Sequence, residues 1–291
     1  MKNVLVTGGA GFVGSHLIEA LLKEEYQVYS IDNYSTGKKE NHIDGARYFE
    51  CDTSNIDSLQ QEDLHFDTIF HLGEYSRIAT SFNEIKKVFE YNLEGTFKVL
   101  EYCRKNDIKL IYAGSSTKFG AAENDDSKGE NLSPYAWMKA KNTELIKNYN
   151  KWYDLDYAIT YFYNVYGPRQ IKDGPYATVI GIFEDLYKQR KPMTVVKPGT
   201  QMRDFTHVND IVRGLILVSQ YGEGDGYCFG TGKSRSILDV ATLFSDNIEM
   251  IPQRLGERSS SEIDFYKSSC IGWKAEVNLE NYIKDFKVFE A

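Results

Sequence analysis

Tyr135 and Lys139 lie four residues apart in SPYAWMK, a segment that opens a predicted helix. Side chains at i and i+4 share one helix face, so the lysine ammonium can stabilise the tyrosine phenolate. A free tyrosine titrates near pH ~10, and it needs such a cation to act as a base at neutral pH. Two further Tyr-x-x-x-Lys pairs, Tyr34–Lys38 and Tyr187–Lys191, lie in a turn-like loop and in a charged run, DLYKQRKP. We therefore expect Tyr135 and Lys139 to be the acid/base pair.

Hydroxyl groups follow a predicted strand upstream of this pair. The strand, at 109–116, runs into Ser115, Ser116 and Thr117. In a parallel sheet, ligands bind outside the carboxyl ends of the strands. A hydroxyl at this edge can hydrogen-bond the substrate oxygen that Tyr135 deprotonates, so we expect Ser115 to complete the catalytic set with Tyr135 and Lys139.

The stretch LVTGGAGFVGSHL (5–17) places four glycines between a predicted strand and a predicted helix. Gly9, Gly11 and Gly14 fit G-x-G-x-x-G, and Gly8 takes the first place in the alternative G-x-x-G-x-x-G. Such a turn lets a pyrophosphate approach the backbone closely and accept hydrogen bonds from the N–H groups at the helix N-terminus. Asp32 ends the second predicted strand, where its carboxylate can accept both adenosine ribose hydroxyls and repel the 2′-phosphate of NADP. The predicted cofactor is NAD.

The elements around these residues alternate between strand and helix patterns, which predicts an α/β fold with a Rossmann-type doubly wound parallel sheet. We expect an NAD-binding domain over 1–166 and a smaller C-terminal α/β substrate lobe over 167–291, with part of 204–232 packing back on the first domain. The polar stretch 121–131 is expected to be a loop. Strands are predicted at 3–8, 27–33, 46–52, 67–73, 109–116 and 157–164, and helices at 16–25, 84–106 and 134–153.

Composition narrows the class of protein. The formal net charge of −8 and pI of about 5.3 argue against nucleic-acid or anionic-membrane binding. No apolar stretch approaches the ~20 residues of a membrane span, and MKNVLV runs directly into the first strand rather than into a signal peptide. The four cysteines are scattered without metal-ligand spacing. We expect a reduced, cytoplasmic protein with no metal site.

These motifs together resemble the extended short-chain dehydrogenase/reductases that act on nucleotide sugars, over nearly the whole length. TGGAGFVG (7–14) and SPYAWMK (133–139) match the family's glycine and Y-x-x-x-K segments, and GSSTKFG (114–120) is similar to its serine segment. RDFTHVND (203–210) is similar to R-D-x-x-x-V-x-D. The resemblance implies a nucleotide-sugar substrate, NAD as cofactor and a homodimer.

The resemblance also assigns roles to single positions. For NAD it implies Gly8, Gly11, Phe12, Val13, Gly14, Asp32, Asn33, Asp52, Leu72, Asn92, Tyr135, Lys139 and Tyr163. For the substrate it implies Ser116, Thr117, Asn164, Arg203 and Arg254, the two arginines gripping the diphosphate. A helical dimer seam is expected from Val88, Leu93, Phe97, Tyr102 and Trp152.

Three departures from the family pattern bear on the reaction. Ser116-Thr117 stands where 4,6-dehydratases carry Asp-Glu, which argues against dehydration. HLGEYSRI (71–78) replaces the commoner HLAA start, which places Glu74 and Arg77 near the expected sugar site. Lys118 occupies a position that is usually apolar.

The sequence therefore favours an NAD-dependent epimerase that inverts C4 of a UDP-hexose through a 4-keto intermediate. A nucleotide-sugar 4-ketoreductase is the alternative, followed by a 4,6-dehydratase. A non-enzymatic NAD sensor is least favoured, because sensing needs no activated phenol.

Overall fold

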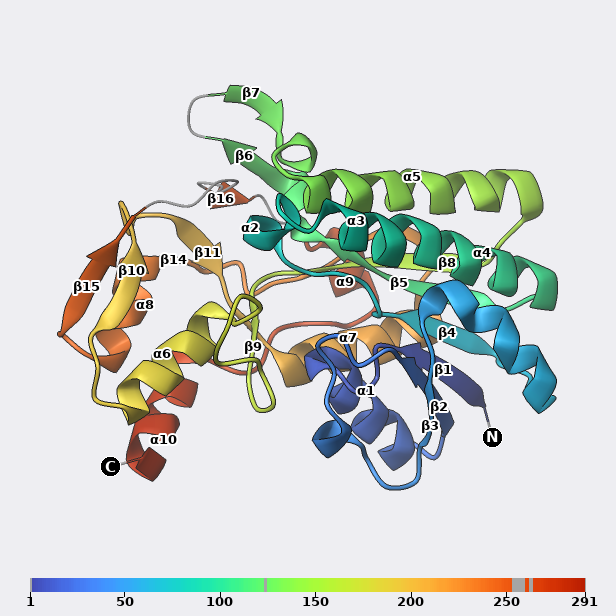
Figure 1. The fold of residues 1–291 in the computed structure, drawn as a ribbon, viewed down its shortest axis with the longest axis horizontal. Helices are drawn as coiled ribbons and strands as arrows, with labels where there is room; N and C mark the ends of the chain where they lie inside the picture. Colours follow the sequence, from blue (N-terminus) through green and yellow to red (C-terminus); the bar gives the residue numbers. More distant parts are fainter. Residues whose placement is uncertain (1, 123–124, 253–259, 262–263, 291) are drawn as a thin grey trace.

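A seven-stranded parallel sheet forms the centre of the computed structural model, which describes residues 2–122, 125–252, 260–261 and 264–290 (Figure 1). The strand order is β13-β8-β5-β4-β1-β2-β3, so the predicted Rossmann-type sheet is confirmed. The strands are β1 (Asn3–Thr7), β2 (Gln27–Asp32), β3 (Arg47–Glu50), β4 (Thr68–His71), β5 (Lys109–Ser115), β8 (Tyr157–Phe162) and β13 (Gly224–Phe229).

The direction in which strands are added reverses at β1. From β1 the chain builds outward through β2 and β3, then returns to the other side of β1 with β4 and β5. The loops that leave the carboxyl ends of β1 and β4 therefore diverge and leave a crevice. The glycine-rich turn follows β1, and the segment beginning at Leu72 follows β4.

Helices cover both faces of this sheet. One face carries α1 (Phe12–Lys23) and α7 (Val208–Tyr221), and the other carries α4 (Gly95–Asn106) and α5 (Pro134–Tyr153). The predicted helix 84–106 is helical from residue 85 onward, and it consists of α3 (Ile85–Val88), a π-helical turn (Phe89–Glu94) and α4. The short α2 (Ile78–Ser81) precedes it.

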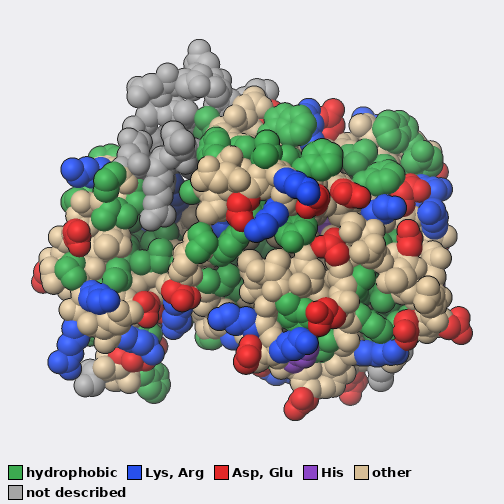
Figure 2. Space-filling model, viewed as in Figure 1, with side chains coloured by type: hydrophobic (Ala, Val, Ile, Leu, Met, Phe, Trp, Pro, Cys, Tyr) green, Lys and Arg blue, Asp and Glu red, His purple; other side chains and the backbone are tan. Residues whose placement is uncertain are grey.

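Large apolar side chains are exposed on the outer surface of α2 to α5. Figure 2 shows hydrophobic side chains interspersed with charged ones over these helices. Phe97 and Trp152 are 44% and 59% exposed. Other exposed members of this outer apolar face are Phe82, Ile85, Phe89, Trp137 and Tyr153.

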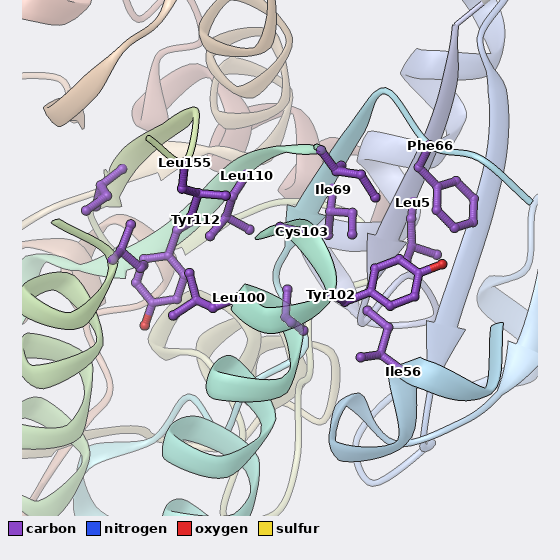
Figure 3. Packing of buried hydrophobic residues seen from close by; sticks show 14 of the residues in the cluster. Leu5, Ile56, Phe66, Ile69, Leu100, Tyr102, Cys103, Leu110, Tyr112 and Leu155 are labelled. Atoms are coloured by element: carbon purple, nitrogen blue, oxygen red, sulfur yellow. The ribbon is translucent and has the colours of Figure 1, made fainter. Parts of the chain in front are cut away.

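Alternation along β1 divides the buried residues between two cores. Val4 and Val6 pack toward α1 and α7, whereas Leu5 packs toward α4 and α5 (Figure 3). Tyr102 lies in the second core and Val88 packs with Tyr135, so both side chains are buried within the monomer. The expectation that Val88 and Tyr102 form a dimer seam is therefore wrong, because the faces they occupy are already covered. Leu93 is partly buried against the same cluster as Val88.

The chain between β8 and α7, together with the segment that follows β13, builds a second layer of structure beside the sheet. It contains α6 (Val179–Lys188), α8 (Ile237–Phe244), α10 (Leu279–Glu290) and the parallel pair β10 (Met193–Val196) and β15 (Ile248–Ile251). These elements share a core that includes Phe183, Val195 and Phe244. Smaller elements are β9 (Val165–Tyr166) paired with β12 (Thr206–His207), β11 (Met202–Asp204) paired with β14 (Ser234–Ser236), and α9 (Tyr266–Cys270).

The sequence analysis predicted a loop over 121–131, but the structure has strands in part of this stretch. β6 (Gly120–Ala122) and β7 (Asp125–Lys128) pair antiparallel and project from the body of the molecule, and β16 (Ser260–Ser261) adds to β6 (Figure 1). The stretch ends in a 3-10 turn, Gly129–Asn131. Polar composition does not reveal a pairing with a strand so distant in the sequence.

The two carboxylates of RDFTHVND have structural partners. Asp210 on α7 accepts N–H bonds from Glu276 and Val277 at 3.0 Å and from Arg213 at 2.9 Å. Asp204 accepts bonds from Thr231 and Gly232. This motif therefore holds two later segments of the chain in place.

Candidate active site

A cavity of about 530 Å³ opens at the carboxyl ends of the strands, between the sheet and the second layer. Its volume lies within the range of roughly 300–1,000 Å³ that is usual for ligand and cofactor sites. The predicted site residues that line it are Gly8, Gly11, Phe12, Val13, Gly14, Asp32, Asn33, Leu72, Ser115, Ser116, Thr117, Tyr135, Lys139, Asn164 and Arg203.

The glycine-rich turn closes one end of this cavity. Gly8 has φ +72°, a conformation that favours glycine, and a Cβ there would lie 2.9 Å from the Cα of Gly73. A Cβ on Gly14 would lie 2.2 Å from the carbonyl oxygen of Gly8. The helix α1 begins at Phe12, directly after this turn, so its first N–H groups are available to an anion. The turn fits the pyrophosphate of a dinucleotide.

Asp32 lies beside the turn at the end of β2. Its carboxylate is 7% exposed and accepts the backbone N–H groups of Ala10 at 2.9 Å and Tyr34 at 2.8 Å. Burial raises the pKa of the Asp32 carboxyl, and these two bonds oppose the shift. Because each carboxylate oxygen can accept more than one bond, Asp32 can still receive hydroxyl groups of a ribose.

The helix α5 presents Tyr135 and Lys139 to the cavity. Ser133 caps the helix by accepting the N–H of Ala136 at 3.1 Å, and Pro134 occupies the first turn. Tyr135 is 8% exposed and Lys139 5% exposed. Ser115, at the end of β5, reaches the same cavity, and its Oγ accepts a bond from the Thr117 hydroxyl at 2.9 Å.

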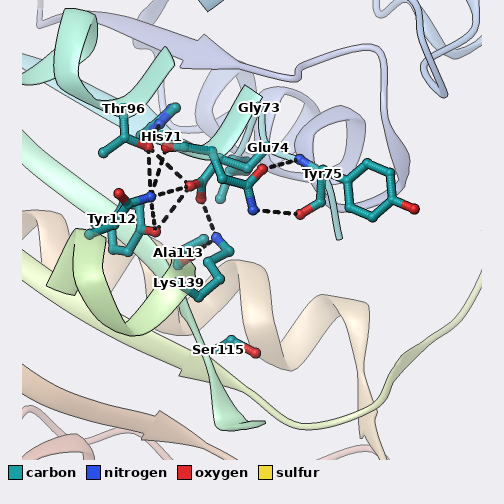
Figure 4. Close-up of polar contacts among 12 residues, drawn as sticks. His71, Gly73, Glu74, Tyr75, Thr96, Tyr112, Ala113, Ser115 and Lys139 are labelled. Carbon is teal, nitrogen blue, oxygen red and sulfur yellow. Dashed lines mark hydrogen bonds and ion pairs between the residues drawn. The ribbon is translucent and has the colours of Figure 1, made fainter. Parts of the chain in front are cut away.

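The Lys139 ammonium contacts a carboxylate that the sequence did not assign to it. Lys139 Nζ forms an ion pair with Glu74 and donates to the carbonyl oxygen of Ala113 at 2.5 Å (Figure 4). Both side chains are almost fully buried, and only 1% of the Glu74 side chain is exposed. The unusual Glu74 of HLGEYSRI was a signal that something differs here, but its partner is 65 residues away in sequence.

A hydrogen-bond chain leads from β1 to Glu74. The Thr7 hydroxyl oxygen accepts the N–H groups of Leu72 and Gly73, so its hydrogen is directed to His71 Nδ1 at 2.8 Å. We therefore assign the hydrogen of His71 to Nε2, which donates to Thr96 at 3.0 Å. The Thr96 hydroxyl in turn donates to Glu74 at 3.0 Å. Burial lowers the pKa of His71 to about 4, consistent with a neutral ring.

Three predicted cofactor residues do not line the cavity. The Asp52 carboxylate accepts bonds from Asn33 and from the backbone of Ser54. Asn92 is fully buried and bonds the backbone N–H and carbonyl of Tyr75. Tyr163 is also buried, near Cys228.

Three further basic residues were singled out in the sequence: Arg77 and Lys118, which depart from the family pattern, and Arg254. Arg77 lines the cavity and donates to the Tyr176 carbonyl at 2.7 Å. Lys118 instead contacts Asp225 at 3.5 Å and Tyr161 at 3.3 Å. Arg254, predicted to bind substrate, lies outside the described residues.

Residues of the second layer complete the cavity wall, and no sequence pattern had identified them as site residues. They include Ile171, Thr178, Ile180, Thr194, Val196, Gln201, Phe205 and Ile237. Among the residues that the structure describes, no group of His, Cys, Asp and Glu side chains could hold a metal ion. None of the helices in the described ranges is long and apolar enough to cross a membrane.

Comparison with known proteins agrees with this geometry. The model of the NAD dependent epimerase/dehydratase family matches residues 4–227. A Methanocaldococcus jannaschii protein provisionally named UDP-glucose 4-epimerase is 32% identical, over 97% of this chain and 96% of its own length. A UDP-N-acetyl-alpha-D-glucosaminuronate decarboxylase of Bacillus cytotoxicus is 32% identical, over 82% and 78% of the two chains. The structure of a Thermotoga maritima UDP-glucose 4-epimerase with UDP-glucose superposes with a TM-score of 0.90 at 28% identity, covering 99% and 98% of the chains.

Proposed function

The chain belongs to the NAD-dependent epimerase/dehydratase family, and we propose that it inverts C4 of a UDP-hexose through a 4-keto intermediate. The observation that carries this proposal is the convergence of Tyr135, Lys139 and Ser115 on the cavity that also holds the glycine-rich turn and Asp32. Residues 1–166 would bind the cofactor, and 167–291 would supply most of the nucleotide-sugar contacts.

Each residue has a role that follows from its chemistry. Tyr135 takes the proton of the C4 hydroxyl and later returns it, while Ser115 hydrogen-bonds the same oxygen. Lys139 provides the cation one helical turn from Tyr135. NAD, which the glycine-rich turn and Asp32 would hold, would supply the hydride acceptor and donor for C4. Arg203, on the cavity wall, has the guanidinium geometry that suits the substrate diphosphate.

Two other reactions, dehydration and decarboxylation, begin with the same oxidation of C4, whereas a ketoreductase starts from the 4-keto sugar and reduces it. A dehydratase requires acid/base groups where this chain has Ser116 and Thr117, which argues against it. A reductase requires release of the oxidised cofactor in each cycle. A decarboxylase, the activity in the name of one relative, requires a substrate with a carboxylate at C5.

The test uses UDP-glucose and UDP-galactose with no cofactor added. We expect interconversion without net change at the nicotinamide absorbance band. In deuterated water no deuterium should enter C4, because the C4 hydrogen does not exchange with solvent. Stoichiometric NADH consumption with a 4-keto sugar nucleotide would show that the protein is a reductase and not an epimerase. Release of carbon dioxide from UDP-glucuronic acid would show that the protein is a decarboxylase.

A further inference from the structure

Glu74 is the acidic side chain in contact with the Lys139 ammonium. We propose that Glu74 is a positioning residue of the reaction proposed above: its carboxylate fixes the Lys139 ammonium and offsets its charge beside Tyr135. The proposal rests on the proposed function for its consequence in catalysis, but the contact itself can be tested without any activity.

The contacts of Glu74 are those of a built anion site. Its Oε1 accepts bonds from Asn142 Nδ2 at 2.8 Å, the Thr96 hydroxyl at 3.0 Å and the Tyr112 hydroxyl at 3.1 Å. Its Oε2 pairs with Lys139. Donors from α4, α5 and β5 therefore hold the carboxylate from three elements (Figure 4). Breaking a buried ion pair of this kind leaves an uncompensated charge, so the position of each partner depends on the other.

Two neutral groups complete the surroundings of the pair. His71 on β4 has a pKa lowered to about 4 by burial, and Tyr112 on β5 has a pKa raised well above its ordinary value by burial and by Glu74. Both stay uncharged through the neutral range, so neither cancels the effect of the carboxylate.

Other charged and titratable groups near Tyr135 include Arg77, Tyr75 and Tyr176. Arg77 lines the same cavity and interacts electrostatically with Tyr135, and burial lowers the pKa of Arg77. Tyr75 and Tyr176 pack in or against the Tyr135 cluster, and both donate to Glu84. These groups are unchanged when Glu74 is replaced, so a shift caused by that replacement reports on Glu74.

The expected sign follows from the charges. A lysine ammonium alone favours the phenolate of Tyr135, whereas a lysine paired with a carboxylate favours it less. Removing the carboxylate charge therefore makes the base form available at lower pH. We expect Glu74→Gln to move the acid limb of the kcat/KM profile to lower pH by about one unit, the low end of the range for a nearby charge.

A matched control separates this effect from loss of a buried glutamate in general. Glu184 on α6 is 1% exposed, pairs with Lys172 at 2.8 Å and accepts bonds from Tyr282 and Gln170, but it does not line the cavity. Glu184→Gln should lower stability without moving the acid limb.

Glu74→Ala should lower kcat on the order of ten- to a hundred-fold, since Lys139 loses its anchor. An acid limb that stays in place in Glu74→Gln, or moves equally in Glu184→Gln, would overturn the proposal.

The second measurement is a double-mutant cycle on urea denaturation of the full chain. Lys139→Met alone leaves Glu74 unpaired and should lower the urea midpoint strongly. Adding Glu74→Gln should restore part of that loss. No restoration would refute the pairing, whatever the enzyme does. If stability is restored but the wild-type protein interconverts no UDP-sugars, the pairing is retained and the proposed function is refuted instead.

Discussion

Tyr135 is the single residue on which the proposed chemistry depends most. Tyr135→Phe removes the acid/base hydroxyl and leaves the glycine-rich turn and Asp32 unchanged. We expect turnover to fall by ~10²–10⁴-fold, the usual contribution of a general acid–base group, with the affinity for NAD retained. Steady-state kinetics and calorimetric titration with NAD measure the two effects. A variant that keeps more than about a tenth of the turnover would contradict this role.

Asp32 should decide between the two nicotinamide cofactors. Its buried carboxylate lies at the end of β2 on the cavity wall, where the 2′-phosphate of NADP would meet a negative charge. We expect the wild type to bind NAD more tightly than NADP, and Asp32→Ala to reduce that preference. Dissociation constants of both cofactors for both proteins test this. Equal affinities in the wild type would mean that the carboxylate does not face the ribose.

His71 should make stability depend on pH. Its pKa is about 4 in the folded protein and 6.5 in its ordinary state, so below pH 6.5 the unfolded chain takes up a proton that the folded chain does not. Stability should therefore be fully present above pH 6.5 and fall by up to about 3 kcal/mol as the pH drops toward 4. His71→Gln should reduce this slope in urea denaturation without abolishing it, because burial also lowers the pKa of His207 to about 4. His65→Gln, at an exposed position, should leave the slope unchanged.

The candidate site was predictable where local spacing carries the chemistry. Tyr135, Lys139, Asp32 and three of the glycines follow from positions on single elements, and all of them line one cavity. The three glycines are Gly8, Gly11 and Gly14, whereas Gly9 packs against Ser30 and Ile18. The partner of Lys139 did not follow, because Glu74 reaches it only through the packing of the β4 loop against α5. The side chains of Asp52 and Tyr163 bond Asn33 and Cys228 and do not line the cavity. The spacing of residues in the sequence does not reveal these contacts.

At the scale of elements, the passage from β1 to α1 depends on the absence of a side chain at Gly14. Helix propensity alone would favour alanine there by ~1 kcal/mol. The 2.2 Å approach to the Gly8 carbonyl oxygen is much tighter than real Cβ contacts, so we expect Gly14→Ala to lower both stability and NAD affinity. At Gly11 the corresponding approach is 3.1 Å. Gly11→Ala should therefore lower the urea midpoint less, and equal losses would contradict this argument.

The central strands were predictable because parallel strands buried on both faces read as continuous apolar runs. β13 was not predicted as a strand, since its sequence GDGYCF contains two glycines and a charge. It joins the sheet through its pairing with β8, with an irregularity between Asp225 and Tyr227. Pairing partners far apart in sequence also explain why β6, β7 and β16 were missed.

At the scale of the whole molecule, the outer apolar face suggests assembly. Phe97 and Trp152 belong to it together with residues of α2 to α5. We predict a homodimer through these helices, because large apolar side chains gathered on one exposed face favour an interaction site. Light scattering should report a dimer at micromolar concentration and a monomer for Phe97→Glu/Trp152→Asp. Tyr266→Asp, at a position that is 75% exposed on α9, is the control and should remain dimeric. A monomeric wild type would refute the prediction.

The position of β13 in the sheet has a consequence for the chain as it leaves the ribosome. β8 is an inner strand only because β13 pairs with it, and β13 is synthesised after the whole segment that contains α6, β10 and α7. The sequence of β8, YAITYF, has no charge and no proline, which is typical of segments that pair with other copies of themselves. During translation this edge stays open until residue 229 has emerged. Until then the open edge of β8 is a surface on which two nascent chains can pair, whereas in the finished fold β5 and β13 cover both sides of β8.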